Sequence, residues 1–256
     1  MRIFGFIPVR LAASRFPRKP LKKIKNRTML EHVYERANLY KKWNTLYVTT
    51  CDKEIISFCE KKKYPSIMTS KKHKRCLDRV YEAAMKQKRK PRDNDVIVCV
   101  QGDEPMLRPQ MIAAVVNTLK KNRSAQASLL AINILTKKDF LNPDTVKVVA
   151  DLKGEVLYTS RSPIPYSKNF SIKNNPKRIG GIFAFRYSFL KKYYSLRPSP
   201  LENFESCDTN RLCDNGGGMY IAPVKYTDYF SVDSPKDLIK VKSNIVKTSI
   251  WKKYKF

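Results

Sequence analysis

The sequence lacks paired cysteine motifs and long apolar runs. Its six cysteines show neither the CxxC pairs of a zinc site nor the density of a small disulfide-bonded fold, so we expect them to be reduced. The first nine residues are apolar apart from Arg2, but Arg10 ends this run well before the roughly 20 residues that a membrane span requires. We therefore expect neither a signal peptide nor a membrane span, and a soluble cytoplasmic protein is the default expectation.

Acidic residues and histidines are also scarce. The chain of 256 residues has 52 Lys and Arg, 22 Asp and Glu, and two His, which gives a formal net charge of +30. This excess fits an acidic partner, which can be nucleic acid, an anionic membrane surface or a phosphate-rich substrate. The basic clusters are spread along the chain and no nucleic-acid-binding motif is present. We therefore expect mostly solvated basic faces, and neither nucleic acid nor membrane as a partner.

The apolar content is high enough for a folded core. Hydrophobic residues make up 42% of the chain and aromatic residues 11%, which excludes a disordered polycationic tail. In the first half, short β-rich runs alternate with longer amphipathic runs, which predicts βαβ units in a mostly parallel sheet. The predicted strands cover residues 2–8, 44–50, 66–69 and 95–100, and the predicted helices cover 29–42, 53–63 and 77–88.

The second half has a different pattern. Strand-like runs at 128–135, 145–151 and 155–160 have little helix between them, which predicts mixed or antiparallel additions to the sheet, and the chain is expected to return to strand at 180–186. Residues 167–178 are predicted to form a polar loop. Ser234 and Pro235, with Asp237 three residues after the serine, predict the start of a C-terminal helix over about 234–250.

The connection after the first strand, residues 8–21, is rich in cations. It lacks the glycines that often hold phosphate at this position of an open α/β sheet. It contains Arg10, Arg15 and Lys19, which could bracket a triphosphate of charge about −4 together with one divalent metal ion. A basic surface loop explains the same spacing equally well.

The strand at 95–100 ends in Gln101, Gly102, Asp103 and Glu104. A carboxylate at a strand end can bind Mg²⁺, which prefers oxygen ligands and usually keeps water and substrate phosphate in its shell. The alternative is that Asp103 caps a helix that begins near residue 108.

Taken together, these segments resemble bacterial 3-deoxy-manno-octulosonate (Kdo) cytidylyltransferases. The first loop has the spacing Pro-x-Arg-x-x-x-Ser-Arg-x-Pro-x-Lys-Pro-Leu, and the strand end reads Val-Gln-Gly-Asp-Glu-Pro. Further similar segments follow in the same order as in that family, at residues 142–149, 158–165, 181–186, 198–202 and 232–238.

The resemblance implies a nucleotide-diphospho-sugar transferase fold in a single domain over 1–256. Its nucleotide-binding half would cover about 1–125, and a sugar-binding and dimerisation portion about 126–230. The implied reaction is the attack of the anomeric hydroxyl of Kdo on the α-phosphorus of CTP, which gives CMP-Kdo and pyrophosphate for lipopolysaccharide biosynthesis. Mg²⁺ would be the cofactor, and a homodimer the expected assembly.

The resemblance also assigns site residues. Lys19, Asp103 and Asp233 would be catalytic, with Asp103 and Asp233 as the metal ligands. The nucleotide would be bound by Arg10, Ser14, Arg15, Lys19, Arg79 and Gln101. Arg161 would pair with the sugar-acid carboxylate, since a guanidinium binds a carboxylate bidentately. The remaining sugar-binding residues would be Glu205, Asp208 and Thr209.

Three positions depart from the family pattern. The segment Arg75-Cys76-Leu77 replaces Ser-Gly-Thr, Ile179 replaces a histidine, and Asp208-Thr209 replaces Glu-Gln. These changes remove a glycine and several hydrogen-bonding groups, although Arg75 could serve as a new phosphate-binding cation. The alternatives are therefore a cytidylyltransferase for a different 2-keto sugar acid, or a catalytically impaired relative.

Overall fold

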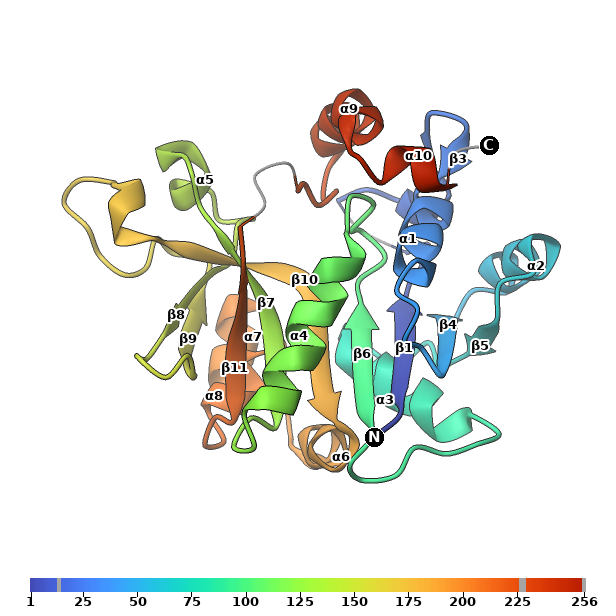
Figure 1. The fold of residues 1–256 in the computed structure, drawn as a ribbon, viewed down its shortest axis with the longest axis horizontal. Coiled ribbons are helices and arrows are strands. Elements are labelled where there is room, and N and C mark those ends of the chain that lie inside the picture. The colour runs from blue at the N-terminus through green and yellow to red at the C-terminus, as the bar shows by residue number, and fades with distance from the viewer. Residues whose placement is uncertain (13–14, 226–228, 255–256) are drawn as a thin grey trace.

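The structure is a computed structural model that describes residues 1–12, 15–225 and 229–254. Its main sheet is ordered β11 (Met219–Val224), β7 (Ala127–Asn133), β10 (Lys177–Arg186), β6 (Val96–Val100), β1 (Ile3–Pro8), β4 (Thr45–Thr50) and β5 (Ser66–Met68). Strand β1 is parallel to both of its neighbours, β4 and β6, and β4 is parallel to β5. Only β10 runs against its neighbours in this path (Figure 1). The prediction of a mostly parallel α/β sheet is confirmed.

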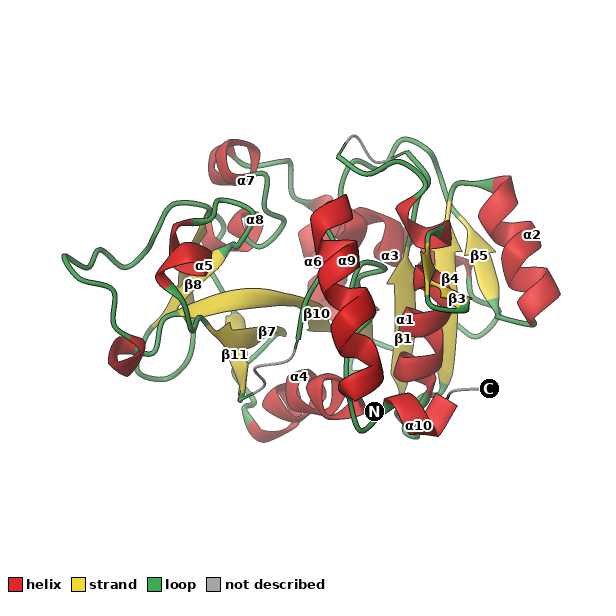
Figure 2. Cartoon of the chain, turned by 90° about the horizontal axis from the view of Figure 1, so that it is seen from above, coloured by secondary structure: helices red, strands yellow, loops and turns green. Residues whose placement is uncertain are grey.

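The predicted antiparallel insertion is also confirmed. Strand β8 (Lys147–Ala150) pairs antiparallel with β9 (Val156–Ser160) and with the start of β10. Strand β10 begins at Lys177, three residues before the predicted start, and crosses from this insertion to the parallel strands (Figure 2). Strand β10 therefore connects the antiparallel insertion to the parallel part of the sheet. A small hairpin, β2 (Lys23–Ile24) and β3 (Arg27–Thr28), follows the first loop.

Helices cover both faces of the sheet. One core cluster joins the sheet to α1 (Met29–Asn38), α2 (Lys53–Lys62), α4 (Pro109–Lys121) and α9 (Pro235–Asn244), and the other joins it to α3 (Cys76–Lys86), α6 (Tyr187–Ser195) and α8 (Asn210–Cys213). Along β6, Val98 belongs to the first cluster and its neighbour Cys99 to the second. Because successive side chains point to opposite faces, a strand covered on both sides is continuously apolar.

Shorter helices complete the chain. They are α5 (Lys137–Leu141), α7 (Pro200–Glu205) and α10 (Trp251–Tyr254), with 3-10 turns η1 (Lys19–Leu21), η2 (Ile172–Asn174) and η3 (Ile245–Lys247). None of the helices in the described ranges is long and apolar enough to cross a membrane. All six cysteines are free, as expected.

Several predicted boundaries were wrong. The first helix ends at Asn38 and not at residue 42, because Leu39 and Tyr40 close it with tight turns back to residues 35–37. The predicted loop at 167–178 contains η2 and the first residues of β10. The C-terminal region is divided into α9, η3 and a further turn of helix, although α9 begins as predicted with a capping box between Ser234 and Asp237.

Candidate active site

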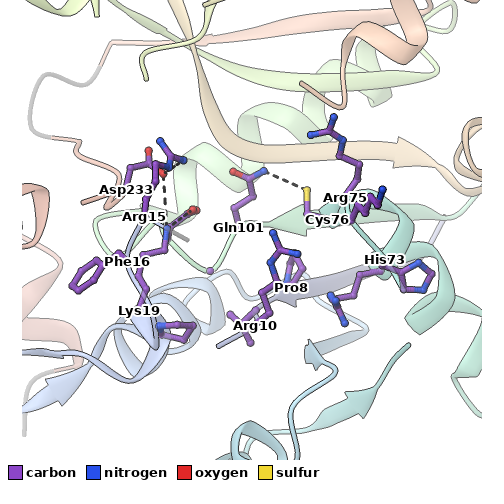
Figure 3. Close-up of a pocket in the computed structure, with 16 residues that line it drawn as sticks. Pro8, Arg10, Arg15, Phe16, Lys19, His73, Arg75, Cys76, Gln101 and Asp233 are labelled. Atoms are coloured by element: carbon purple, nitrogen blue, oxygen red, sulfur yellow. Dashed lines mark hydrogen bonds and ion pairs between the residues drawn. The ribbon is translucent and has the colours of Figure 1, made fainter. Parts of the chain in front are cut away.

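An open cavity of about 270 Å³ lies at the carboxyl ends of β1 and β6. Side chains from the first loop, from the start of α3 and from the segment before α9 converge on it (Figure 3). In open α/β sheets, ligands bind in the crevice at this edge. The predicted site residues that line it are Arg10, Arg15, Lys19, Arg79, Gln101, Asp103 and Asp233. Ser14 lies outside the described residues.

Lys19 lies between the two carboxylates that were predicted to bind metal. Its Nζ donates to Asp103 Oδ2 at 3.0 Å and to the Val232 carbonyl oxygen at 2.7 Å, and it lies 3.9 Å from Asp233 Oδ1. Burial alone would lower the pKa of Lys19, but the charges of Asp103 and Asp233 raise it overall. The ammonium therefore stays charged at neutral pH.

Asp103 follows Gln101 and Gly102 after the end of β6 and does not cap a helix. Helix α4 begins at Pro109 after Arg108, which corrects the alternative interpretation of this carboxylate as a helix cap. Asp103 Oδ1 is buried and has no hydrogen-bond partner among the described residues. A buried acceptor without a partner is costly, so this oxygen is suited to a ligand that enters the cavity.

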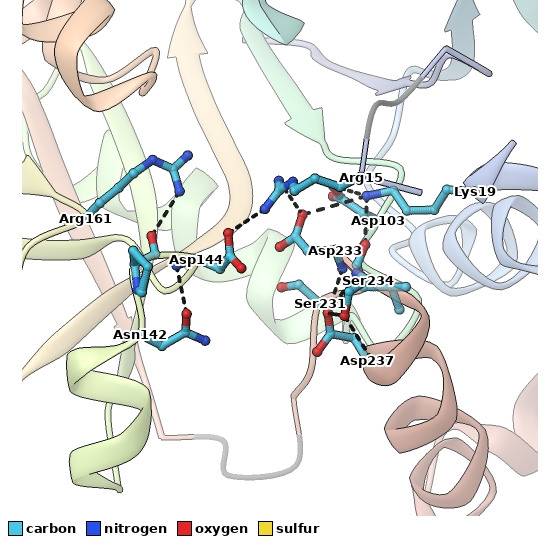
Figure 4. A network of polar contacts seen from close by, with 12 residues as sticks. Arg15, Lys19, Asp103, Asn142, Asp144, Arg161, Ser231, Asp233, Ser234 and Asp237 are labelled. Atoms are coloured by element: carbon cyan, nitrogen blue, oxygen red, sulfur yellow. Dashed lines mark hydrogen bonds and ion pairs between the residues drawn. The ribbon is translucent and has the colours of Figure 1, made fainter. Parts of the chain in front are cut away.

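Asp233 is held through its own backbone N–H and that of the preceding residue. Its N–H donates to Asp237 Oδ2 at 3.1 Å, and the N–H of the preceding Val232 donates to the Asp103 carbonyl oxygen at 2.9 Å. Burial, followed by the charge of Asp103, raises the pKa of Asp233. The capping box of α9 therefore fixes the second carboxylate beside the first (Figure 4).

These two carboxylates fit Mg²⁺ better than a metal that is held by protein ligands alone. The described residues contain no group of three or more His, Cys, Asp or Glu side chains that could hold a metal. Mg²⁺ is usually bound by one or two carboxylates, with water and substrate phosphate completing its shell. The free oxygen of Asp103 beside Asp233 matches that requirement.

Arg15 joins three segments of the chain. Its Nη1 donates to Asp144 Oδ1 at 2.6 Å and its Nη2 to Asp233 Oδ1 at 3.0 Å (Figure 4). The Arg15 side chain is about half exposed, and such exposed ion pairs add little stability. An anion that enters the cavity can therefore replace Asp144 and Asp233 as the partner of this guanidinium at a small cost in free energy.

Glu104 is a site-supporting residue to which the sequence assigned no role. It is 2% exposed and accepts hydrogen bonds from Gly181 N at 3.0 Å and from Ser231 Oγ at 2.9 Å. Burial raises its pKa to about 7. It thus ties β10 and the segment before Asp233 to the end of β6. Its position after an apolar strand was the only sequence signal.

Gln101 and Arg79 form part of the cavity wall, and each also donates a hydrogen bond to a neighbouring protein group. Gln101 Nε2 donates to Cys76 Sγ at 3.3 Å, and Arg79 Nη1 donates to the Ser70 carbonyl oxygen at 3.3 Å. Arg79 is buried, whereas Arg10 is exposed at the cavity mouth.

The four predicted sugar-binding residues lie outside the cavity lining. Arg161 Nε donates to the Glu205 carbonyl oxygen at 2.8 Å, and Arg161 N donates to Glu205 Oε2 at 2.8 Å. Thr209 is 1% exposed and bonds Thr159 Oγ1 at 2.8 Å. Asp208 contacts the start of α3, and burial raises its pKa. Their roles toward a sugar stay predictions.

Comparisons with known proteins consistently find that this chain is similar to cytidylyltransferases. The cytidylyltransferase family model matches residues 4–221. The 3-deoxy-manno-octulosonate cytidylyltransferase of Thermodesulfovibrio yellowstonii is 37% identical over 240 residues, covering 91% of this chain and 93% of that protein. The enzyme of the same name from Arabidopsis thaliana, described as mitochondrial, is 35% identical over 244 residues, covering 94% and 82%.

A solved structure shares the fold. It is the structure of a CMP:2-keto-3-deoxy-manno-octonic acid synthetase complexed with CTP, with a TM-score of 0.86 and 32% identity. The similarity covers 96% of this chain and 99% of that chain. The mostly parallel sheet and the cavity at its carboxyl edge agree with these similarities, which extend along nearly the whole chain. This protein therefore belongs to the 3-deoxy-manno-octulosonate cytidylyltransferases of the cytidylyltransferase family.

Proposed function

We propose that this nucleotidyltransferase transfers CMP from CTP to the anomeric hydroxyl of Kdo and releases pyrophosphate. The observation that carries the proposal is the convergence of Lys19, Asp103 and Asp233 with Arg10 and Arg15 on one cavity. The relatives that match over most of this chain carry this activity in their names, and the similar structure holds CTP. The alternatives, a different 2-keto sugar acid or an impaired relative, are not favoured.

The cavity residues suit phosphate transfer by charge neutralisation and positioning. The sugar hydroxyl oxygen forms a bond to the α-phosphorus while the bond from that phosphorus to the β-phosphate oxygen breaks, and the hydroxyl proton is released. Arg10, Arg15 and Lys19 provide three positive charges for a triphosphate of about −4, and guanidinium groups bind phosphate bidentately. Such a reaction needs little covalent chemistry from the protein.

Asp103 and Asp233 are the residues that would hold Mg²⁺. When bound there, the ion would neutralise charge on the phosphate oxygens. Lys19 keeps both carboxylates at the cavity floor through its ammonium, and the backbone N–H of Val232 bonds the Asp103 carbonyl.

Arg161 is the group we assign to the Kdo carboxylate. Its Nε and Nη1 donate to the carbonyl oxygens of Glu205 and Pro143, at 2.8 and 3.0 Å. An arginine side chain has five N–H donors, so three remain for a carboxylate. The two carbonyl contacts fix the plane of the guanidinium, which reduces the entropy that is lost on binding.

We also propose a homodimer that acts in the cytoplasm, in lipopolysaccharide biosynthesis. Large apolar side chains are exposed in and near the β8–β9 hairpin, which supports a protein partner at this end of the molecule. They are Leu152, Leu157, Tyr166 and Ile172. Sedimentation velocity tests the assembly, because a monomer at micromolar concentration would exclude it.

The activity is tested by measuring pyrophosphate release from nucleoside triphosphates with Mg²⁺ and Kdo. We expect release with CTP and Kdo, and at most slow release with ATP or UTP. Faster release with another 2-keto sugar acid than with Kdo would instead identify a changed acceptor. Binding of CTP without turnover of any acceptor would identify an impaired relative.

A further inference from the structure

Arg75 lies where the cavity meets the second half of the chain. It directly precedes α3, and its side chain lines the cavity (Figure 3). Its guanidinium bonds α7: Nε lies 3.2 Å from Glu202 Oε1, and Nη2 donates to the Glu202 carbonyl oxygen at 3.2 Å. The same Nε lies 3.8 Å from Asp208 Oδ1. One side chain is thus part of the cavity wall and of the contact with the segment 199–214, which contains α7 and α8.

Glu202 is a fixed partner for Arg75. It is fully buried, and its two carboxylate oxygens accept hydrogen bonds from Arg211 Nε and Nη2, both at 2.7 Å. Arg211 in turn donates to Asp78 of α3 at 3.2 Å. Because this carboxylate is held bidentately and away from water, its position is well defined. Arg75 therefore bonds a rigid point on α7.

Asp208 provides a second connection between the same two elements. Helix α3 receives no side-chain hydrogen bond from its own N-cap residue, Arg75. Instead, Asp208 Oδ2 accepts from Leu77 N at 3.4 Å and from Cys76 Sγ at 3.2 Å. A carboxylate at this end of a helix is favoured by the free N–H groups and by the helix dipole. The segment 199–214 thus caps the helix whose first residues line the cavity.

The far end of α7 reaches the predicted sugar-acid site. Glu205 accepts hydrogen bonds from Arg161 N at 2.8 Å and from the Tyr158 hydroxyl at 3.0 Å, and its carbonyl oxygen accepts from Arg161 Nε at 2.8 Å. Hydrogen-bonded contacts therefore run without a break from Arg75 through Glu202, along α7 and through Glu205 to Arg161.

We propose that Arg75 is a positioning residue that couples the nucleotide cavity to the acceptor site. Through Glu202 it fixes α7, and α7 fixes the guanidinium of Arg161. The proposal rests on the proposed function in naming CTP and Kdo as the two ligands. A residue that acts only as a phosphate-binding cation would affect CTP alone, whereas a positioning residue affects the acceptor across α7.

Steady-state kinetics distinguish these two roles. Replacement of Arg75 by glutamine is expected to raise the KM for Kdo by about five- to tenfold, with a smaller effect on the KM for CTP. Arg75→Lys keeps the ion pair with Glu202 and should restore part of the loss. Lys72→Gln is the matched control, since it removes the same charge from an exposed residue of the same loop that lies outside the cavity lining. It should leave the KM for Kdo unchanged.

Hydrogen–deuterium exchange of the ligand-free protein tests the contact with α7 independently of activity. Peptides within 199–214 should exchange faster in Arg75→Gln than in the wild type or in Lys72→Gln, while β1 and α4 keep their protection. Unchanged exchange at 199–214, or faster exchange with an unchanged KM for Kdo, would overturn the coupling. A wild type that turns over no Kdo would refute the proposed function, and the exchange comparison would still decide whether Arg75 holds α7.

Discussion

Lys19 accounts for how two carboxylates can share the floor of a phosphate-binding cavity. Asp103 and Asp233 both face its ammonium, at 3.0 and 3.9 Å. Without a cation between them, two neighbouring carboxylates repel each other and one tends to become protonated. The raised pKa of Lys19 shows that its charge is stabilised by these neighbours in spite of burial. The same positive charge is then available to the phosphates of a nucleotide.

We expect Lys19→Met to lower kcat/KM for CTP by on the order of 100-fold or more, because one preorganised cation is lost from a site where charge develops. Pyrophosphate release measures the effect. Arg18→Gln is the matched control: Arg18 directly precedes Lys19, but its side chain pairs with Glu54 outside the cavity lining. It should stay within about twofold of the wild type, since exposed ion pairs contribute little. A Lys19→Met protein as active as the control would contradict this account.

At the scale of elements, β10 contains two adjacent glycines with different structural roles. A Cβ at Gly180 would lie 2.7 Å from the end of the Leu130 side chain, in the apolar core. A Cβ at Gly181 would lie 2.3 Å from Glu104 Oε1 and 2.8 Å from Gln101 Oε1. Because successive residues of a strand point to opposite faces, one glycine permits core packing and the other permits the polar support of the cavity.

Alanine substitutions should therefore have different effects at these neighbours. Gly180→Ala should lower the free energy of unfolding by about 1–3 kcal/mol through overpacking, with kcat/KM of the folded protein within about twofold of the wild type. Gly181→Ala should lower kcat/KM by at least about tenfold, since displacement of Glu104 and Gln101 disturbs the end of β6. Urea unfolding and pyrophosphate release measure the two effects. Equal losses of activity in both variants would contradict the assignment of Gly180 to core packing and of Gly181 to the support of the cavity.

The elements of the first half could be predicted because each is locally encoded. Strands β1 and β6 are covered on both faces and therefore form uninterrupted apolar runs. Helix α6 was missed in the prediction: its sequence combines aromatic residues with lysines, and its N-cap residue, Arg186, makes no side-chain capping bond. Its position is set by tertiary packing, with Leu190 and Tyr193 buried against the sheet.

The candidate site could be predicted only where its residues stand close to a motif. The loop cations and the carboxylate after β6 have local signals in the sequence. The roles of Glu104 and Arg75 do not, because Glu104 bonds Gly181 and Arg75 bonds Glu202, 77 and 127 residues away. The sequence suggested Arg75 only as a new phosphate-binding cation and gave no indication of its bonds to α7. Contacts at such separations follow from the fold and leave no periodicity to detect.

At the scale of the whole molecule, the C-terminal segment that follows Asp233 is anchored on α1. Arg36 Nε donates to the Tyr254 hydroxyl at 2.7 Å, and His32 Nδ1 lies 3.0 Å from the same oxygen. His32 Nε2 lies 2.8 Å from the Ile24 carbonyl oxygen, which requires Nε2 to carry a proton. His32 Nδ1 then accepts from the tyrosine hydroxyl, so this chain of bonds needs a neutral imidazole.

This anchor should make stability depend on pH. Burial lowers the pKa of His32 from 6.5 to about 4, so the unfolded chain takes up a proton at a higher pH than the folded protein does. The stabilisation is therefore complete above about pH 6.5 and is lost as the pH falls towards 4. Between pH 7.5 and 5 the loss should be about 2 kcal/mol. Urea unfolding of the wild type and of His32→Gln measures it, and an equal pH slope in both proteins would contradict it.

The most direct test of the central claim is pyrophosphate release from CTP, Mg²⁺ and Kdo by the wild type, Asp103→Asn and Asp93→Asn. Asp93 is an exposed carboxylate that pairs with Lys191, so it controls for the same chemical change away from the cavity. We predict release by the wild type and by Asp93→Asn, and a loss of on the order of 100-fold or more in Asp103→Asn. Full activity in Asp103→Asn would contradict the account.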